Sequence, residues 1–285
     1  MPGKLLVVAT PLGNLDDLTP RALGALRSAE IVLCEDTRRT AKLLARYGLS
    51  VPTLSHHRFN EKQRIESILG RLRAGQTVAM VSDSGTPGVA DPGALLVRAA
   101  LRDGITVSPL PGPSAVATLL SVSGLPADRY VFEGFLPSRE GERRRRLRGL
   151  REEPRTLVFF EAPHRVVAAL RDMEEILGPR EVVLGRELTK QHEEILRGTP
   201  DEVASRLGRG VRGEITLVVA GADPSGGEAT VDAAAERLLQ CWRAALEAAD
   251  GDRRSALRQT ARTLGLKRAE LYRRLAELGR DGEDP

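Results

Sequence analysis

Residues 82–93 read SDSGTPGVADPG and hold the densest group of side chains suited to chemistry in the chain. Asp83 and Asp91 stand among three glycines and two prolines, directly after the apolar run TVAMV. A connection between a strand and a helix needs only a few residues, so this loop is longer than chain reversal requires. Glycine lets the backbone approach a ligand closely, and proline holds a loop in shape at little entropic cost. The loop therefore predicts a ligand-binding site.

Further polar segments follow other predicted strands. They are TPLGN (10–14), EDTRRT (35–40), SHHRFNE (55–61), PGPSA (111–115), FFEAPHR (159–165), GRELTKQHEE (185–194) and RGEIT (212–216). In an open α/β sheet, ligands bind beyond the carboxyl ends of the strands. We therefore expect these segments to gather around one site with residues 82–93.

The elements that must position these loops are short apolar strands and helices with apolar residues at three- and four-residue spacing. The first half predicts strands at 5–10, 31–36, 53–57, 77–83 and 106–110, with helical patterns between them. This alternation favours a mostly parallel sheet covered by helices. The second half predicts strands at 130–135, 156–161, 181–188, 193–198 and 214–220. Strands outnumber helices there, so we expect a mixed sheet.

The predicted fold class is α/β, in two domains with a helical extension. Residues 109–116, with three prolines, suit a hinge, and residues 221–230 suit a flexible linker. We assign an N-terminal α/β domain to residues 1–112 and a second α/β domain to 113–222. Residues 231–285 would form a helical extension with a helix-turn-helix-like pattern.

Composition sets broad limits on function. The chain has 285 residues, enough for two α/β domains, and its net charge of +4 with pI 9.4 weakly favours a polyanionic partner. Aromatic residues make up 3% of the chain, which argues against base stacking as the main binding device. Two distant cysteines and the lack of a long apolar run predict a soluble, cytoplasmic protein with no membrane contact.

Several familiar sites are missing from the sequence. No GxGxxG follows the first strand, and there is no GxxxxGK[ST], HExxH or GxSxG. His56 and His57 are adjacent, and the other two histidines are isolated. We therefore expect no dinucleotide fingerprint, no phosphate loop and no metal site.

Eight ordered segments carry a specific resemblance. TPLGNLDDLTPRA, CEDTRRT, SDSGTPGVADPG, PLPGPSA, FEGFLP, FFEAPHR, RELTKQHEE and RGEITLVVAG together resemble the tetrapyrrole methylase superfamily and, within it, the ribosomal RNA small-subunit methyltransferase I subfamily. The resemblance runs from about residue 5 to 221, and the tail is similar to that subfamily's C-terminal extension. Phe59 stands where that pattern usually has histidine, and SDSG differs slightly from the usual Asp-Ala-Gly form.

The resemblance implies S-adenosylmethionine in a cleft between two α/β domains, and a homodimer. It also implies methylation of the ribose 2′-oxygen of a decoding-centre cytidine in 16S ribosomal RNA, within the small subunit. A neutral nucleoside with a sulfonium fits a loop of glycines and carbonyl oxygens, and it needs no phosphate fingerprint. The cofactor-binding residues implied are Pro11, Gly13, Asp83, Gly85, Thr86, Pro87, Val89, Ala90, Asp91, Ser114, Ala115, Phe160, Glu161, Ala162, Glu214 and Thr216.

A ribose hydroxyl is a weak nucleophile, so a base within hydrogen-bond reach would help by roughly 10²–10⁴-fold. Candidates are Glu35, Asp36, His57, Asp91 and Glu187, although Asp91 could instead cap a helix. Lys190, close to Glu187 in sequence, could stabilise a developing oxyanion.

Basic side chains are candidates for RNA contact: Arg38, Arg39, Arg144, Arg145, Arg254, Arg258, Lys267 and Arg268. Alternatives stay open, because Arg38 and Arg39 could pair with Glu35 and Asp36. Charge runs are often only solvated helix faces, and the tail could pack on a neighbouring subunit. Two other functions also stay open: a tetrapyrrole C-methyltransferase of the same fold, and a non-enzymatic nucleic-acid-binding regulator.

Overall fold

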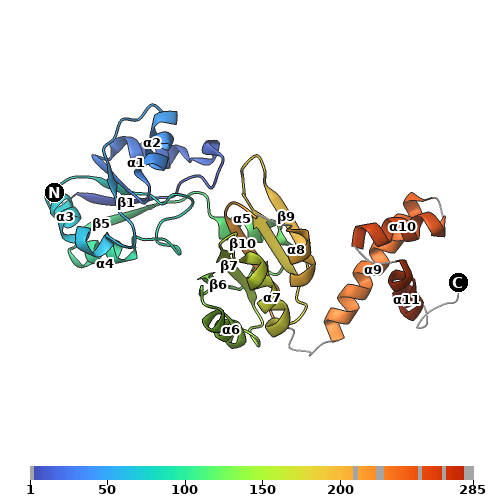
Figure 1. Cartoon of the computed structure of the whole chain (residues 1–285). Coiled ribbons are helices and arrows are strands. Elements are labelled where there is room, and N and C mark those ends of the chain that lie inside the picture. Colours follow the sequence, from blue (N-terminus) through green and yellow to red (C-terminus); the bar gives the residue numbers. More distant parts are fainter. Residues whose placement is uncertain (1–2, 208–210, 223–227, 250–251, 265–267, 279–285) are drawn as a thin grey trace. The chain divides into compact units, whose positions relative to one another are not determined.

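The computed structural model describes residues 3–207, 211–222, 228–249, 252–264 and 268–278 (Figure 1). The chain divides into two compact units, Met1–Ala222 and Asp223–Pro285, which are described separately below. No helix in the described ranges is long and apolar enough to cross a membrane.

The first sheet of the larger unit is parallel, as predicted. It contains β1 (Lys4–Val8), β2 (Ile31–Cys34), β3 (Thr53–Ser55), β4 (Val78–Met80) and β5 (Thr106–Leu110), in the order β3-β2-β4-β1-β5. Leu26 of α1 (Pro20–Ser28) and Leu44 of α2 (Thr37–Arg46) belong to the apolar core on one face. Residues of α3 (Glu61–Arg73) and α4 (Ala94–Arg102) belong to the core on the other. Because helices cover both faces, the two strands β2 and β4 are apolar and buried throughout, and the carboxyl ends of the strands are left for function.

The second sheet is mixed, again as predicted, with the order β6-β7-β10-β8-β9. Its strands are β6 (Tyr130–Phe135), β7 (Thr156–Glu161), β8 (Val182–Arg186), β9 (Glu194–Gly198) and β10 (Ile215–Val219). Only the β6–β7 pair is parallel. The helices are α5 (Ala115–Ser123), α6 (Glu140–Gly149), α7 (Val166–Leu177) and α8 (Pro200–Arg206). Phe159 and Leu170 are fully buried in the core between the sheet and α7.

Strands that lead into the polar loops end earlier than the sequence indicated. The strand predicted at 31–36 ends at Cys34, because Asp36 leaves the sheet to accept the Arg38 N–H at the start of α2. The strand predicted at 77–83 ends at Met80. In both cases the extra residues belong to the candidate site rather than to the sheet.

The expectation that Asp91 caps a helix is wrong. α4 begins at Ala94, after Gly93, and no side chain of the 82–93 loop caps it. Instead the buried Glu61 carboxylate, at the start of α3, accepts N–H groups of Gly93 (3.0 Å), Leu95 (3.2 Å) and Leu96 (3.4 Å). A carboxylate at a helix N-terminus satisfies free donors and the helix dipole, so Asp91 is not needed for that role.

The smaller unit is helical, as predicted, and consists of α9 (Glu228–Ala248), α10 (Arg253–Leu264) and α11 (Arg268–Leu278). Leu238, Ala261 and Leu271 form its buried core. Residues 228–230, which the sequence assigned to a linker, are helical. The remaining domain boundaries, at 112 and 231, stay predictions.

Candidate functional site

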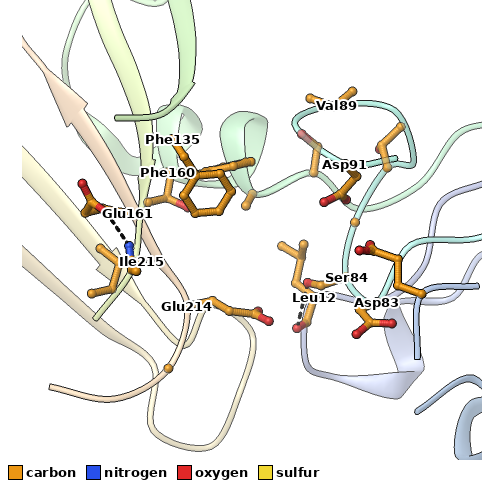
Figure 2. Close-up of a pocket in the computed structure, with 18 of the residues that line it drawn as sticks. Leu12, Asp83, Ser84, Val89, Asp91, Phe135, Phe160, Glu161, Glu214 and Ile215 are labelled. Carbon is orange, nitrogen blue, oxygen red and sulfur yellow. Dashed lines mark hydrogen bonds between the residues drawn. The ribbon is translucent and has the colours of Figure 1, made fainter. Parts of the chain in front are cut away.

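A cavity of about 390 Å³ lies in the larger unit, beyond the carboxyl ends of strands from both sheets (Figure 2). Its volume falls within the range of roughly 300–1,000 Å³ that is usual for small-molecule sites. It is lined by Leu12, Glu35, Arg39, Asp83, Ser84, Gly85, Thr86, Val89, Asp91, Ser114, Ala115, Phe135, Phe160, Glu161, Ala162, Pro163, Gly213, Glu214, Ile215 and Thr216.

The backbone of the 82–93 loop is tied to the loop after β1. Thr10 and Gly85 exchange backbone hydrogen bonds of 2.8 and 3.1 Å, and the Ser84 hydroxyl donates to the Leu12 carbonyl at 3.3 Å. Gly85 has φ +81°, and a Cβ there would meet Leu12 at 3.3 Å. This position therefore requires glycine, and the cavity floor is preformed.

Five carboxyl groups line the cavity: Glu35, Asp83, Asp91, Glu161 and Glu214. Burial, with the charges of Glu35, Asp83 and Glu214, raises the pKa of Asp91 to about 7. Burial and the charge of Asp83 also raise the pKa of Glu35. A carboxyl group that exchanges its proton near neutral pH is suited to general acid–base chemistry.

Arg39 lies at the rim between two of these carboxylates. Its guanidinium is 3.5 Å from Asp83 and 3.8 Å from Glu214, so it bridges the loop that follows β4 and the residue that precedes β10. Asp83 also accepts the backbone N–H of Asp36 at 3.0 Å. Arg38, in contrast, pairs with Asp36 at 3.0 Å and does not line the cavity.

Aromatic and aliphatic side chains of the second sheet form the opposite wall (Figure 2). The Phe160 ring contacts Phe132 and Phe135 edge-on, with centroids 5.0 and 5.6 Å apart. Phe135, Phe160 and Ile215 face the cavity. Such a surface suits a flat, uncharged ring system.

Glu161 is fully buried beside this wall. It accepts the Ala162 N–H at 2.7 Å and pairs with Arg165 at 2.5 Å. Its second carboxylate oxygen, Oε2, has no hydrogen-bond partner within the described residues. Buried acceptors are nearly always paired, so this orphan oxygen fits a donor group of a bound ligand.

Glu187 and Lys190 lie just outside the cavity lining. The Lys190 ammonium donates to Glu187 at 2.8 Å and is 3.5 Å from Glu214; the Lys190 bond lowers the pKa of Glu187. Glu187 and Thr189 both have positive φ, +53° and +65°. The Asn14 N–H donates to the Thr189 hydroxyl at 3.0 Å, so this loop joins the one after β1.

Most of the sequence-predicted site residues meet at the cavity. Those that do not line it are Pro11, Gly13, Asp36, His57, Pro87, Ala90, Glu187 and Lys190. Sequence reasoning missed Leu12, Ser84, Phe135, Pro163, Gly213 and Ile215, although each stands inside a segment singled out above. These residues were missed because their side chains are small or apolar, and such side chains do not indicate a particular chemistry in a sequence.

The predicted RNA contacts divide by their surroundings. Arg144 already pairs with Asp172 and Glu175, and its side chain is 21% exposed, so its charge is engaged within the fold. Arg145, Arg254, Arg258 and Arg268 are exposed. Lys267 lies outside the described residues.

The histidines offer no metal site in the part of the chain that the structure describes. His56 is buried, burial lowers its pKa, and its Nε2 lies 3.8 Å from Glu61. His57 is held by Asn60 in the turn after β3. Among the described residues, no group of three or more histidine, cysteine, aspartate or glutamate side chains is arranged so that it could hold a metal ion.

Comparisons with known proteins agree on one family. Residues 4–204 match the family described as tetrapyrrole (corrin/porphyrin) methylases. A protein of Thermotoga maritima named ribosomal RNA small subunit methyltransferase I is 49% identical over 220 residues, 77% of this chain and 99% of that one. Its namesake in Synechocystis is 42% identical over 282 residues, 98% of this chain and all of that one.

A solved structure supports the fold. The uroporphyrin-III C-methyltransferase of Thermus thermophilus, complexed with S-adenyl homocysteine, covers 76% of this chain and 96% of its own, with a TM-score of 0.54 and 21% identity. The Synechocystis match also extends through the helical tail.

Proposed function

Because the chain belongs to the tetrapyrrole methylase family and, within it, to the ribosomal RNA small subunit methyltransferases I, we propose that it 2′-O-methylates a ribose of 16S ribosomal RNA with S-adenosylmethionine. The nucleotide proposed is a cytidine of the decoding centre. The single observation that carries the proposed chemistry is Asp91, a carboxyl with a pKa of about 7 on the cavity wall. Small ribosomal subunits in the cytoplasm would be the place of action.

The cavity has the features that S-adenosylmethionine requires. Bound there, this cofactor supplies a methyl group on a positively charged sulfur. Phe160 and Ile215 would contact the adenine ring, while Asp83 and Glu214 offer negative charge to the sulfonium and amino groups. The unpaired Glu161 oxygen supports the same assignment, because it needs a donor.

Asp91 would act as the general base. Its carboxylate would hold the ribose 2′-hydroxyl by a hydrogen bond and accept its proton as the oxygen attacks. With a pKa of about 7, a large share of the group is ionised at neutral pH, and such matching favours proton transfer. Glu35, whose pKa is also raised, would keep the Asp91 pKa high by charge repulsion.

Positioning would supply much of the remaining acceleration. Holding two reactants in line can contribute about 7–11 kcal/mol, and the bonds between Thr10 and Gly85 give the cavity floor a fixed shape. Lys190 and Glu187 would act as positioning residues, because Lys190 reaches Glu214 rather than the cavity itself.

RNA would be held outside the cavity by basic side chains. Arg145 and the tail residues Arg254, Arg258 and Arg268 are exposed and available for phosphate contacts. Each phosphate contact releases counterions, so binding should weaken steeply with salt. A homodimer, which the family resemblance implies, would bring two such surfaces to one substrate.

The test is a transfer assay with radiolabelled S-adenosylmethionine and small ribosomal subunits that lack the modification. The RNA is then digested and its nucleosides are identified by mass spectrometry. We expect 2′-O-methylcytidine, with no incorporation into subunits that are already modified. Cofactor binding without transfer to subunits or naked RNA would contradict the proposal and favour a tetrapyrrole substrate, for which a uroporphyrinoid acceptor is the direct check.

A further inference from the structure

Phe59 differs in its setting from the other phenylalanines of the chain. Of the five, Phe132, Phe135, Phe159 and Phe160 lie on β6 and β7, where they pack in the core or border the cavity. Phe59 lies in the turn between β3 and α3 and is 85% exposed. Single exposed apolar residues are common on surfaces, so exposure alone does not make a site.

The turn that carries Phe59 is firmly held. The His57 N–H donates to Asn60 Oδ1 at 2.8 Å, and the Asn60 and Glu61 N–H groups both donate to the His57 carbonyl at 2.9 Å. The Phe59 N–H lies 3.3 Å from His57 Nδ1, and the Asn60 amide donates to the Ser55 carbonyl. The ring is therefore presented to solvent from an ordered backbone. Because the backbone is already fixed, binding a partner at this ring would cost little backbone entropy.

Cationic and aromatic groups surround the ring. The Arg58 guanidinium carbon lies 5.7 Å from its centroid, and the His57 ring meets it edge-on with centroids 6.0 Å apart. Lys62, the second residue of α3, is exposed. An exposed aromatic ring beside arginine is the arrangement with which proteins stack unpaired bases and attract their phosphates.

The turn that carries the ring follows β3, and β3 lies beside a strand that leads into the cavity. β2 and β3 are neighbours, with Cys34 paired to Ser55. Glu35, which follows Cys34, lines the cavity and interacts electrostatically with His57. Neighbouring strands are about 4.8 Å apart, so the Phe59 turn borders the acidic edge of the cavity.

We propose that Phe59, with Arg58 beside it, is a stacking platform for an unpaired base of the RNA substrate, next to the nucleotide that is methylated. This inference rests on the proposed function, since it requires an RNA substrate. The low aromatic content excludes stacking as the main source of affinity. One platform beside the cavity would instead fix the register of the RNA over Asp91.

The experiment compares Phe59→Ala, Phe59→Leu and Phe59→Trp with the wild-type protein. Affinity for unmodified small subunits and affinity for S-adenosylmethionine are measured separately, at several salt concentrations. Tyr130→Ala, at a 44% exposed aromatic residue on β6, is the matched control.

Loss of one stacked base should weaken subunit binding by about 5- to 100-fold, since stacking contributes about 1–3 kcal/mol per base. We expect this loss for Phe59→Ala and Phe59→Leu, recovery for Phe59→Trp, and no change for Tyr130→Ala. Cofactor affinity and the slope of affinity against salt should stay constant, because stacking releases no counterions.

Three results would overturn the inference. Equal subunit affinity for Phe59→Ala and the wild type would exclude the platform, and full affinity for Phe59→Leu would show a contact without stacking. A loss of self-association in Phe59→Ala, measured by sedimentation, would make the ring a protein interface. If the wild-type protein does not methylate subunits, both the proposed function and this inference are contradicted. If the wild type methylates subunits and the Phe59 variants bind them with wild-type affinity, only this inference is contradicted.

Discussion

The two walls of the cavity differ in chemistry. The wall from the first sheet presents Glu35, Asp83 and Asp91, whereas the wall from the second presents Phe135, Phe160 and Ile215. Burial is the largest cause of the raised Asp91 pKa. One wall therefore holds the proposed base, and the other offers an apolar surface to the bound cofactor.

The largest effect should come from the acidic wall. Asp91→Asn removes the proposed base but keeps the shape, so kcat should fall by about 10²–10⁴-fold while cofactor affinity changes little. Single-turnover assays with small subunits and calorimetric titration of the cofactor measure the two quantities. Asp128→Asn, at an exposed aspartate away from the cavity, is the control. An unchanged kcat in Asp91→Asn would remove Asp91 from the mechanism.

The same substitution tests the pKa directly. The folded-state pKa of about 7 lies above the ordinary aspartate value of 3.8, so the folded protein retains a proton that the unfolded chain releases. Stability from this group is therefore lost as pH rises from about 4 through 7. Without cofactor, Asp91→Asn should be more stable than the wild type at pH 8, by about 1–3 kcal/mol, and similar at pH 3. Denaturant unfolding at the two pH values checks this.

The apolar wall should matter more for affinity than for chemistry. Phe160→Ala removes the ring that faces the cavity, so the Kd for S-adenosylmethionine should rise by about 10- to 100-fold, in line with about 1.5–3 kcal/mol for a buried aromatic side chain. Phe132→Ala is the matched control, because Phe132 contacts Phe160 but does not line the cavity. It should lower stability and leave the Kd much closer to the wild-type value. An equal rise in Kd in the two variants would contradict the proposal that the Phe160 ring contacts the cofactor directly.

A smaller effect is expected at the backbone of the acidic wall. Gly85→Ala places a side chain at φ +81° and against Leu12, so the free energy of unfolding should fall by about 1–2 kcal/mol. Gly24→Ala is the opposite case, because Gly24 lies within α1 with nothing within 4 Å of an added Cβ. It should raise stability by about 0.8–1 kcal/mol. Thermal unfolding measures the stability of both variants. A Gly85→Ala variant as stable as the wild type would show that this turn does not fix the shape of the cavity floor.

The smallest expected effect comes from Glu35→Gln, which separates the two causes of the raised Asp91 pKa: burial and the charge of neighbouring carboxylates. Glu35→Gln removes one repelling charge but leaves the apolar wall in place. The Asp91 pKa should therefore fall, and the rising limb of the kcat profile should move to lower pH by about half a unit, or about 0.7 kcal/mol. Steady-state rates between pH 5 and 9 measure the midpoint. A shift to higher pH would contradict the repulsion between Glu35 and Asp91.

The sequence predicted the sheets better than it predicted the edges of the site. Strands at 106–110, 130–135 and 156–161 were predicted with the observed ends, because turn residues bound them. In the first sheet, three strands that lead into the cavity, β1, β2 and β4, were predicted to end two or three residues too late. Glu35 and Asp83 stand next to apolar strand residues, and no local pattern shows where hydrogen bonding to the neighbouring strand stops.

Residues that act through tertiary contacts were beyond local patterns. Glu61 was interpreted as part of a loop motif, yet its carboxylate caps α4 by accepting the N–H of Gly93, 32 residues farther along the chain. Leu12 and Ile215 have no chemical signature, and only the folded chain brings them to the cavity. In contrast, the sequence alone was enough to predict Asp83, Asp91 and Glu214, because charged residues in glycine-rich loops are recognisable as candidate binding residues.

The Glu61 cap also has a consequence for how the molecule can move. The backbone amides of Gly93, Leu95 and Leu96 can become free only when α3 and α4 separate at that carboxylate. The turn that presents Phe59 and the loop that ends at Gly93 therefore share one mechanical anchor. A displacement of either loop is therefore passed to the other in part through Glu61, a charged side chain that is buried from solvent.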